Sequence, residues 1–498
     1  MRSVLIRLKP LDKQISVARG TSLIDVLHEF GVEFPCGGKG ICGKCKVNLL
    51  QGDIPLSPGH KRKLEELGLP PGWRLACMSK AGSDLVLEVG QYEAMIQADD
   101  SPFAFESRPG FGIAVDLGTT TLIAQLVDLR TAKVLAVETA LNPQRRWGSD
   151  LISRIESALD GKGPELTRMI RREIGRMTRD LIGDRGIVPE QILLVGNTVM
   201  HHLFSGLDVR PLAFYPFESP DIGTKHFTPS ELGWSIHSKK ICFYPSIGSF
   251  VGSDILAGIY ATGMWKRSGY TILVDLGTNG EIVVGNREKL LCASTAAGPA
   301  FEGAKISMGM LATTGAISSV HGDASGIKCR VIGNVPATGI CGSGLMDAVA
   351  VLLEKGLLGS FGEILSGDAS LALTDRVKLT ASDLQEFLLA KAAINAGLTI
   401  LLRKLEIGVD DISRIYIAGA FGSYINLESM SRLNMMNFPA DRFRKLGNSA
   451  LIGAKMFLYS EEETKESILS LTSHVNLESE PDFQDIFIDR ISLVPPSS

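Results

Sequence analysis

Residues 112–121 read GIAVDLGTTT, and residues 271–280, 159 positions further along, read TILVDLGTNG. Each copy is an apolar run that leads into an Asp-Leu-Gly-Thr turn, and a second apolar run follows the turn. This is the pattern of two strands joined by a tight turn. Because an internal repeat indicates repeated structure, the pair predicts two similar α/β halves in the long C-terminal part of the chain.

The repeat has a second part in each half. Ile192–Thr198 and Ile415–Gly422 both read as an apolar strand, a glycine turn and the start of a helix. The distance from the aspartate of the first motif to the first glycine of the second is 80 residues in the first half and 144 in the second. We therefore expect lobe I at residues 111–265, lobe II at residues 266–498, and an insertion within lobe II at Leu291–Asp375.

The two Asp-Leu-Gly-Thr turns have the chemistry of a phosphate site. Glycine lets the backbone approach a phosphate, while threonine hydroxyls and turn amides donate hydrogen bonds to its oxygens. Asp116 and Asp275 cannot donate to phosphate, but a carboxylate at the end of a buried strand is a suitable partner for Mg²⁺. For a single copy of the motif, a well-capped turn would be the favoured interpretation. Two copies in duplicated halves predict that these aspartates lie on opposite sides of one cleft.

The N-terminal 90 residues predict a separate α+β domain. Strand-like runs at Val4–Leu8 and Gln14–Val17 precede an amphipathic stretch at Leu23–Val32. Further strands are expected at Lys46–Leu50 and Asp84–Val89, with a helix between them. This order is typical of a ferredoxin-like β-grasp fold. Residues 91–110 are polar and turn-forming, as in a linker.

Four of the eight cysteines fall in this first domain. Cys36, Cys42 and Cys45 follow the spacing C-x5-C-x2-C in a glycine-rich loop, and Cys77 follows 31 residues later. The spacing is close to that of plant-type two-iron ferredoxins, and the glycines leave amide groups free to approach thiolate and sulfide. Tetrahedral zinc is the alternative, but structural zinc sites prefer two C-x2-4-C pairs, and here only one pair has that spacing.

Composition excludes several classes of protein. Of 498 residues, 45% are hydrophobic and 21% are charged, and the 51 Lys and Arg almost balance the 55 Asp and Glu. Disorder and a polybasic nucleic-acid binder are therefore disfavoured. No apolar run reaches the roughly 18 residues of a membrane-spanning helix, and Met1–Lys9 carries charges where a signal peptide would be apolar. We expect a cytoplasmic protein without nucleic-acid or membrane partners.

The nucleotide-site motifs resemble those of a known superfamily. Asp116–Thr121, Asp275–Glu281 and Ile417–Tyr424 are similar to the phosphate-1, phosphate-2 and adenosine motifs of the actin, sugar kinase and heat-shock chaperone ATPases. The resemblance implies a duplicated, two-lobed α/β ATPase of the actin-like type that binds ATP and Mg²⁺. The implied catalytic carboxylates are Asp116, Asp275 and Glu281. The implied nucleotide-binding residues are Gly118, Thr119, Thr120, Gly277, Thr278, Asn279, Gly419 and Gly422.

Fused behind a two-iron ferredoxin domain, this ATPase resembles the reductive activators of corrinoid proteins. The resemblance implies a [2Fe-2S] cluster held by Cys36, Cys42, Cys45 and Cys77. It also implies ATP-dependent electron transfer to a Co(II) corrinoid protein, which regenerates Co(I) for methyl transfer. An upstream electron donor and a homodimer are further expectations. The chain departs from some relatives in having little sequence between the cluster domain and the ATPase, and no C-terminal cysteine-rich segment.

Three other functions are compatible with parts of the sequence. One is an ATP-driven electron donor to another low-potential enzyme, such as a dehydratase. A second is a small-molecule kinase with a redox-sensing domain, and a third is a redox-gated binding module without turnover. His201 and His202 are adjacent on a predicted helix, so we expect them in a packed face rather than on one metal ion. Cys341 lies among glycines, as in a tight turn that opens a helix.

Overall fold

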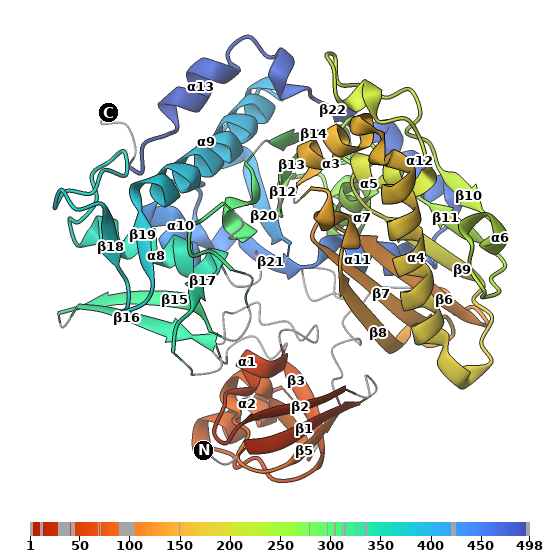
Figure 1. Cartoon of the computed structure of the whole chain (residues 1–498), viewed down its shortest axis with the longest axis horizontal. Coiled ribbons are helices and arrows are strands. Elements are labelled where there is room, and N and C mark those ends of the chain that lie inside the picture. The colour runs from red at the N-terminus through yellow and green to blue at the C-terminus, as the bar shows by residue number, and fades with distance from the viewer. Residues whose placement is uncertain are drawn as a thin grey trace.

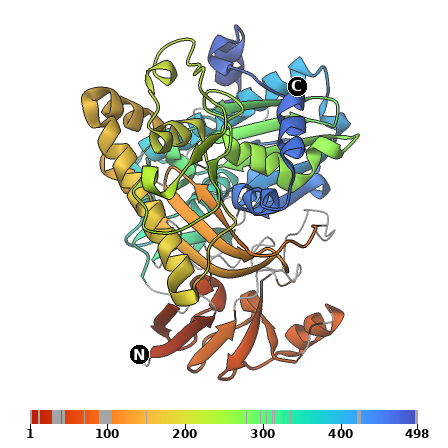
Figure 2. The same ribbon diagram turned by 90° about the vertical axis from the view of Figure 1, so that its right-hand side faces the viewer.

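Two α/β lobes lie side by side, and a small N-terminal domain lies below them in the view of Figure 1. Figure 2 shows the same separation after a quarter turn. The computed structural model describes residues 3–9, 13–27, 40, 45–67, 69, 71–88, 105–148, 150–277, 279–295, 297–302, 305–310, 312, 315–324, 326–332, 336–419 and 425–494. These residues carry the account that follows.

The N-terminal domain is a five-stranded mixed sheet with the strand order β2-β1-β5-β3-β4. Strand β1 alternates exposed and buried residues, so that Val4, Ile6 and Leu8 enter the core. It pairs antiparallel with β2 and parallel with β5. The elements are β1 (Ser3–Lys9), β2 (Lys13–Ala18), α1 (Leu23–Leu27), β3 (Lys46–Gln51), α2 (Pro58–Glu66), β4 (Trp73–Leu75) and β5 (Leu85–Glu88). The expected β-grasp arrangement is confirmed.

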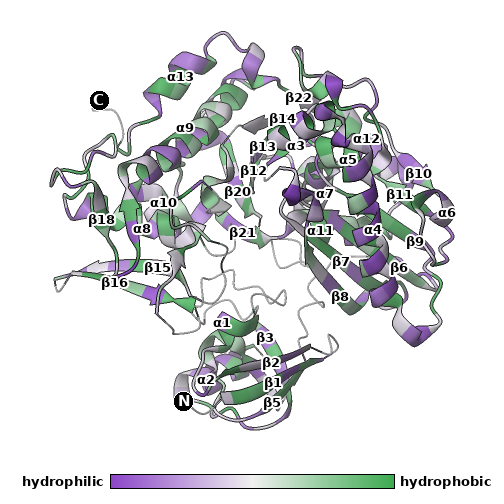
Figure 3. Cartoon of the chain, in the orientation of Figure 1, coloured by the Kyte–Doolittle hydropathy of each residue, from purple (hydrophilic) through white to green (hydrophobic). Residues whose placement is uncertain are grey.

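Lobe I is built on a six-stranded sheet with the order β10-β11-β9-β6-β7-β8. Its strands are β6 (Phe111–Leu117), β7 (Thr121–Asp128), β8 (Lys133–Leu141), β9 (Gln191–Val195), β10 (Lys225–Phe227) and β11 (Ile241–Phe243). Its helices are α3 (Leu151–Ser157), α4 (Gly163–Ile182), α5 (Thr198–Ser205), α6 (Pro229–Leu232) and α7 (Ser253–Thr262). Figure 3 shows largely hydrophobic strands β7 and β8 beside α4, whose outer face is polar. Helix α4 covers the sheet because its apolar residues recur at helical spacing.

Lobe II repeats this plan with the strand order β21-β20-β12-β13-β14-β22. Its sheet consists of β12 (Tyr270–Leu276), β13 (Gly280–Gly285), β14 (Leu290–Thr295), β20 (Ile412–Ala418), β21 (Phe443–Gly447) and β22 (Thr472–His474). Its helices are α9 (Ala381–Lys404), α10 (Leu427–Arg432), α11 (Ser449–Phe457), α12 (Glu462–Leu471) and α13 (Phe483–Asp489), together with α8 (Gly342–Glu354) of the inserted segment. Helix α9 is long and apolar enough to cross a membrane, but 72% of its apolar window is buried within the protein. It is the core helix of this lobe.

The pairing of the strands in the two sheets confirms the predicted duplication. Each first motif is an antiparallel hairpin, β6-β7 in lobe I and β12-β13 in lobe II. Each second motif supplies a parallel neighbour, so that Asp116 lies opposite Val195 and Asp275 lies opposite Ala418. The aspartates therefore occupy equivalent positions in the two sheets.

The elements that distinguish lobe II begin later than the expected start of the insertion. Leu291–Thr295 belong to β14, which pairs with β13 inside the common sheet, so the start at Leu291 is wrong by one strand. The apolar run Leu290–Ala293 is buried because it is a sheet strand. The additional elements are β15 (Ala316–Asp323), β16 (Gly326–Val331), β17 (Gly339–Ile340), α8 (Gly342–Glu354), β18 (Ser370–Ala372) and β19 (Lys378–Thr380).

Helices α7 and α11 pack against each other between the two sheets. Their residues share one hydrophobic cluster with Ala114 of lobe I and Leu273 of lobe II. The helices approach so closely that a Cβ at Gly453 would lie 1.9 Å from the carbonyl oxygen of Ala257. The two lobes are thus joined through a backbone-to-backbone helix crossing.

Candidate functional site: an interlobe carboxylate cluster and a cysteine domain

Four carboxylates from both lobes influence one another electrostatically. Asp116 lies near the end of β6, and Asp275 occupies the equivalent place on β12. Glu281 lies directly opposite Asp275 on β13. The fourth is Asp254, in the first turn of α7. All four side chains are half-buried, so each faces a restricted volume of solvent.

Burial raises the pKa values of three of these groups, and repulsion between carboxylates adds to the effect for two of them. Burial raises the pKa of Asp116 to about 6, although a hydrogen bond from Asn448 opposes the shift. Burial and the charges of Asp116 and Asp275 raise the pKa of Asp254 to about 8. Burial, together with the charges of Asp254 and Asp275, raises the pKa of Glu281 well above its usual value. A cation at this place would relieve the repulsion.

The donor set suits Mg²⁺. Carboxylate oxygens are the hard ligands that Mg²⁺ prefers, and it binds through one or two of them together with water and substrate phosphates. Among the described residues, no three His, Cys, Asp or Glu side chains converge closely enough to chelate a metal ion. The cluster therefore fits a cation that shares its coordination with a ligand.

The start of α11 links the two aspartates. The side-chain amide of Asn448 donates to Asp116 Oδ2 across the lobes at 2.7 Å. The next residue, Ser449, donates to Asp275 Oδ2 at 3.1 Å. Asn448 also accepts from the amide of Leu451 at 2.8 Å, which caps the helix. One helix terminus thus holds both motif aspartates in place.

In each lobe, a glycine of the second motif packs closely against the first motif. Gly419 has φ +88°, and a Cβ there would lie 2.7 Å from Asp275 Oδ1 and 2.5 Å from the carbonyl oxygen of Leu276. In lobe I a Cβ at Gly196 would lie 2.7 Å from the carbonyl oxygen of Leu117. Only glycine fits at either position, so the second motif of each half touches the first.

The predicted turn residues differ in how much of them the structure describes. Gly118, Thr119 and Thr120 form the turn between β6 and β7, where a Cβ at Gly118 would meet the carbonyl oxygen of Thr121 at 2.5 Å. In lobe II the amide of Gly277 donates to the carbonyl of Asn279 at 3.0 Å. Thr278 and Gly422 lie outside the described residues. The structure therefore brings together Asp116, Asp275, Glu281, Gly419 and the described turn residues.

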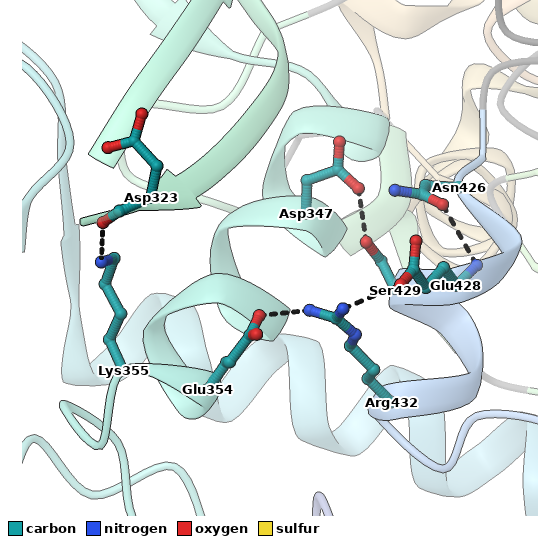
Figure 4. A network of polar contacts seen from close by, with 8 residues as sticks. All are labelled: Asp323, Asp347, Glu354, Lys355, Asn426, Glu428, Ser429 and Arg432. Atoms are coloured by element: carbon teal, nitrogen blue, oxygen red, sulfur yellow. Dashed lines mark hydrogen bonds and ion pairs between the residues drawn. The ribbon is translucent and has the colours of Figure 1, made fainter. Parts of the chain in front are cut away.

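A polar network fastens α10, which follows the second motif of lobe II, to α8 (Figure 4). Asp347 of α8 is buried and accepts from the Ser429 hydroxyl at 2.6 Å. Arg432 of α10 forms ion pairs with Glu354 of α8 and with Glu428. The inserted helix α8 is thereby attached to the segment that leaves the nucleotide motif.

The described part of the cysteine loop lies on the N-terminal sheet. Cys45 is buried, and its carbonyl accepts from the amide of Ala76 at 2.8 Å, which brings it beside the short helix that carries Cys77. Gly40 has φ +73°, and a Cβ there would lie 2.9 Å from Met78 Sδ. Cys36 and Cys42 lie outside the described residues. The adjacency of Cys45 and Cys77 fits a cluster held by residues of both segments.

Three residues that the sequence singled out, His201, His202 and Cys341, are buried and hydrogen-bonded within lobes I and II. His202 is buried, with Nδ1 2.8 Å from the carbonyl oxygen of Thr198 and Nε2 2.7 Å from the Ser219 hydroxyl. His201 Nε2 lies 3.1 Å from the carbonyl oxygen of Gly223, so the expected packed helix face is confirmed. Cys341 is buried at the start of α8, where its thiol donates to the carbonyl oxygen of Ile317 at 3.4 Å.

Sequence reasoning missed Asp254, Asn448 and Ser449. All three follow a glycine at the point where a segment enters α7 or α11: Gly252-Ser253-Asp254 and Gly447-Asn448-Ser449. The sequence signal for these residues was the Gly-x-x pattern that occurs before α7 and again before α11. It is shorter than the Asp-Leu-Gly-Thr repeat and indicates a helix start without indicating what the helix faces.

Comparison with known proteins agrees with this architecture along the whole chain. Residues 6–82 match the "2Fe-2S iron-sulfur cluster binding domain", and residues 111–267 match the "RACo middle region". Residues 269–496 match the "C-terminal domain of RACo the ASKHA domain". The N-terminal domain is therefore a [2Fe-2S] domain and the two lobes are an ATP- and Mg²⁺-binding unit of the ASKHA type.

Known proteins resemble the chain over most of its length. The "Corrinoid activation enzyme RamQ" of Eubacterium limosum is 33% identical over 579 aligned positions, which cover 96% of this chain and 97% of the relative. The "[Co(II) methylated amine-specific corrinoid protein] reductase" of Methanosarcina barkeri is 27% identical over 77% of each chain. A solved structure, "Reductive activator for corrinoid,iron-sulfur protein", superposes with a TM-score of 0.70 at 26% identity over 98% of both chains. The chain belongs to the family of reductive activators of corrinoid proteins.

Proposed function

We propose that this protein uses ATP to return a Co(II) corrinoid protein to the Co(I) state, for use in methyl transfer. The observation that carries the proposal is the presence, in one chain, of a ferredoxin-type cysteine domain and an interlobe carboxylate site. The relatives aligned over almost the whole chain are named for corrinoid activation or corrinoid reduction. A small-molecule kinase would not need the ferredoxin-type cysteine domain to phosphorylate its substrate.

Cys36, Cys42, Cys45 and Cys77 hold the cluster in this proposal. When bound, a plant-type cluster supplies a one-electron carrier with a potential near about −400 mV. Super-reduced cobalt is an acceptor at least as demanding, so a simple downhill transfer would stall. The ATPase lobes address this problem, because nucleotide that binds one lobe arrangement better than another shifts the population of that arrangement.

Asp116, Asp275 and Glu281 are the carboxylates that orient Mg-ATP, and Asp254 joins them. Gly118, Thr119, Thr120, Gly277, Thr278, Asn279, Gly419 and Gly422 approach the nucleotide. Residues 1–90 form the cluster domain, residues 91–110 the linker, and residues 111–265 and 266–498 the two lobes. The protein works in the cytoplasm, takes its electron from an upstream donor and forms a homodimer. These assignments extend the proposal to named residues and partners.

The decisive experiment uses the full chain with its cluster, purified without oxygen and reduced. It is mixed with a Co(II) corrinoid protein, and the visible spectrum is followed with and without Mg-ATP. Conversion to Co(I) that requires Mg-ATP is the expected result. Asp275→Ala should abolish the conversion and leave the cluster spectrum intact, while Cys45→Ser should alter the spectrum. An intact spectrum and steady ATP hydrolysis without conversion would point to another low-potential acceptor.

A further inference from the structure

The three carbonyl groups of the lobe I turn, Gly118 to Thr120, all point into the lobe. The side-chain amide of Asn142 donates to the Gly118 carbonyl at 3.0 Å, and its backbone amide donates to the Thr120 carbonyl at 2.9 Å. The carbonyl between them, that of Thr119, accepts from the guanidinium of Arg154 at 2.5 Å. Both donors are completely buried.

This orientation fixes the other side of the turn. In a planar trans peptide the carbonyl and the following N–H point in opposite directions. The amides of Thr119 and Thr120 must therefore point away from Asn142 and Arg154. The side-chain amide of Asn197 donates to Thr119 Oγ1 at 3.0 Å, so the Thr119 hydroxyl keeps its own proton for another acceptor. The Thr119 hydroxyl and the two turn amides therefore lie on the side of the turn opposite the buried donors Asn142 and Arg154.

Arg154 is held rigidly in this role. It lies in α3, whose first turn is capped by Asp150 and Ser153 in a reciprocal pair. Its Nε donates to the Gly148 carbonyl at 3.0 Å and one terminal nitrogen to Gln144 Oε1 at 3.4 Å. Gln144 is itself buried and donates to the carbonyl of Leu166 at 3.1 Å. The guanidinium therefore has little freedom to leave the Thr119 carbonyl.

The equivalent turn in lobe II is built differently. There the amide of Gly277 donates to the carbonyl of Asn279 within the turn itself, at 3.0 Å. At the one pair of equivalent carbonyls that can be compared, Thr120 accepts from Asn142 outside the turn, whereas Asn279 accepts from Gly277 inside it. This difference separates the two halves of an otherwise duplicated site.

We propose that Arg154 is a positioning residue that fixes the Gly118–Thr120 turn as the phosphate-binding turn of the nucleotide site. The inference rests on the proposed ATP site and adds a determinant of affinity for the phosphates. Arg154 acts through the backbone of Thr119, and the nucleotide's phosphate oxygens accept from the donors on the opposite side. Loss of Arg154 should therefore weaken the binding of phosphates and leave recognition of the nucleoside unchanged.

The test measures how ADP and adenosine inhibit the ATPase activity of the full chain. For Arg154→Met we expect the inhibition constant of ADP and the KM for ATP to rise about tenfold or more, the size of a hydrogen bond to a charged group. The inhibition constant of adenosine should stay within about twofold, a change too small for the loss of one such bond. Arg154→Lys keeps a charged donor and should recover part of the ADP affinity.

Arg171→Met is the matched control. Arg171 is also a lobe I arginine that donates from Nε to a backbone carbonyl, that of Phe204, at 2.7 Å, but it serves helix α5. Arg171→Met should lower the melting temperature, and it should not raise the inhibition constant of ADP more than that of adenosine. Equal weakening of ADP and adenosine by Arg154→Met, or no effect of Arg154→Lys and Arg154→Met on ADP, would overturn the inference. If the native chain neither binds nor hydrolyses ATP, the proposed function fails first.

Discussion

At the scale of single residues, the interlobe site is a set of carboxylates kept close together at an electrostatic cost. Asp116, Asp254 and Glu281 all have raised pKa values because burial disfavours ionisation, and neighbouring carboxylate charges add to the effect for Asp254 and Glu281. A protein does not retain such repulsion for stability, since one carboxylate fewer would fold better. The proposed function explains the arrangement, because a cation that binds together with phosphate would offset the repulsion.

The raised pKa values predict how the Mg²⁺-free protein responds to pH. A group whose folded pKa is raised stabilises the fold below its unfolded pKa, and this stabilisation is lost as the pH rises through the folded value. For Asp116 and Asp254 the loss falls between about pH 4 and about pH 8. His201 and His474, whose pKa values burial lowers to about 4, have the opposite effect below pH 6.5. The melting temperature should therefore fall between about pH 6.5 and 8.

Asp254→Asn isolates the contribution of the cluster. The substitution keeps the shape of the side chain and removes one charge, so the fall in melting temperature above pH 6.5 should become shallower. Adding Mg²⁺ to the native chain should raise the melting temperature more at pH 8 than at pH 6.5. Differential scanning fluorimetry across pH measures both effects. Parallel profiles for the two proteins would show that Asp254 does not titrate in this range.

Asn448 predicts a second residue-scale effect. Asn448→Ala removes both the hydrogen bond to Asp116 and the cap of α11, whereas Asn448→Ser can keep the cap but is too short to reach Asp116. Loss of the cap should cost about 1 kcal/mol of stability in urea unfolding for the alanine variant alone. Both variants should lose ATPase activity, by about tenfold. If Asn448→Ser keeps full activity, the bond to Asp116 is not needed.

At the scale of elements, the position of one lobe relative to the other depends on the crossing of α7 and α11. The first turn of α7 carries Asp254, and the start of α11 carries Asn448 and Ser449, so the crossing also sets the spacing of the site. Gly453 and Gly258 permit the close approach. Any change that separates these helices should disturb stability and nucleotide binding together.

Gly453→Ala tests this coupling. The new methyl group would overlap the Ala257 carbonyl, so we expect a loss of stability of about 3 kcal/mol and a loss of ATPase activity. Gly263→Ala is the control, because Gly263 ends α7 at φ +65° with no atom within 4 Å of a Cβ. It should cost only about 1 kcal/mol, from backbone strain, with activity retained. Urea unfolding and ATPase assays of both variants give the comparison, and equal losses would contradict it.

At the scale of the whole molecule, the cluster domain contacts the ATPase through the inserted hairpin of lobe II. Asp25 of α1 forms an ion pair with Arg330 of β16. The same hairpin is attached to α8, because Lys355 donates to the carbonyl of Asp323 at 2.8 Å, and α8 is attached to α10 (Figure 4). A continuous set of contacts therefore leads from the cysteine domain to the segment after the nucleotide motif.

Charge reversal tests the contact between Asp25 and Arg330. A surface ion pair contributes about 0.2–1 kcal/mol, so Arg330→Asp should leave the melting temperature almost unchanged. It should instead increase the radius of gyration measured by X-ray scattering, because the cluster domain loses its attachment. The double variant Asp25→Arg with Arg330→Asp should restore the native value. Unchanged scattering for the single variant would mean that other contacts hold the domain.

The sequence by itself determined the architecture and half of the site. The Asp-Leu-Gly-Thr repeat predicted two lobes with Asp116 and Asp275 at equivalent positions, because a strand and its turn are encoded by neighbouring residues. The spacing of the cysteines predicted the cluster domain for the same reason. The binding roles of the four cysteines and of the motif residues stay predictions, and Cys36, Cys42, Thr278 and Gly422 lie outside the described residues.

Only the tertiary structure decided which other residues meet these aspartates. Asn448 reaches Asp116 across 332 positions of sequence, and Arg154 of helix α3 supports the Thr119 turn from 35 positions away. Asp254 joins the cluster because α7 packs between the sheets and its first turn faces both lobes. Such contacts depend on how helices cross and where they begin, and no local pattern of residues encodes the neighbour that a helix terminus will face.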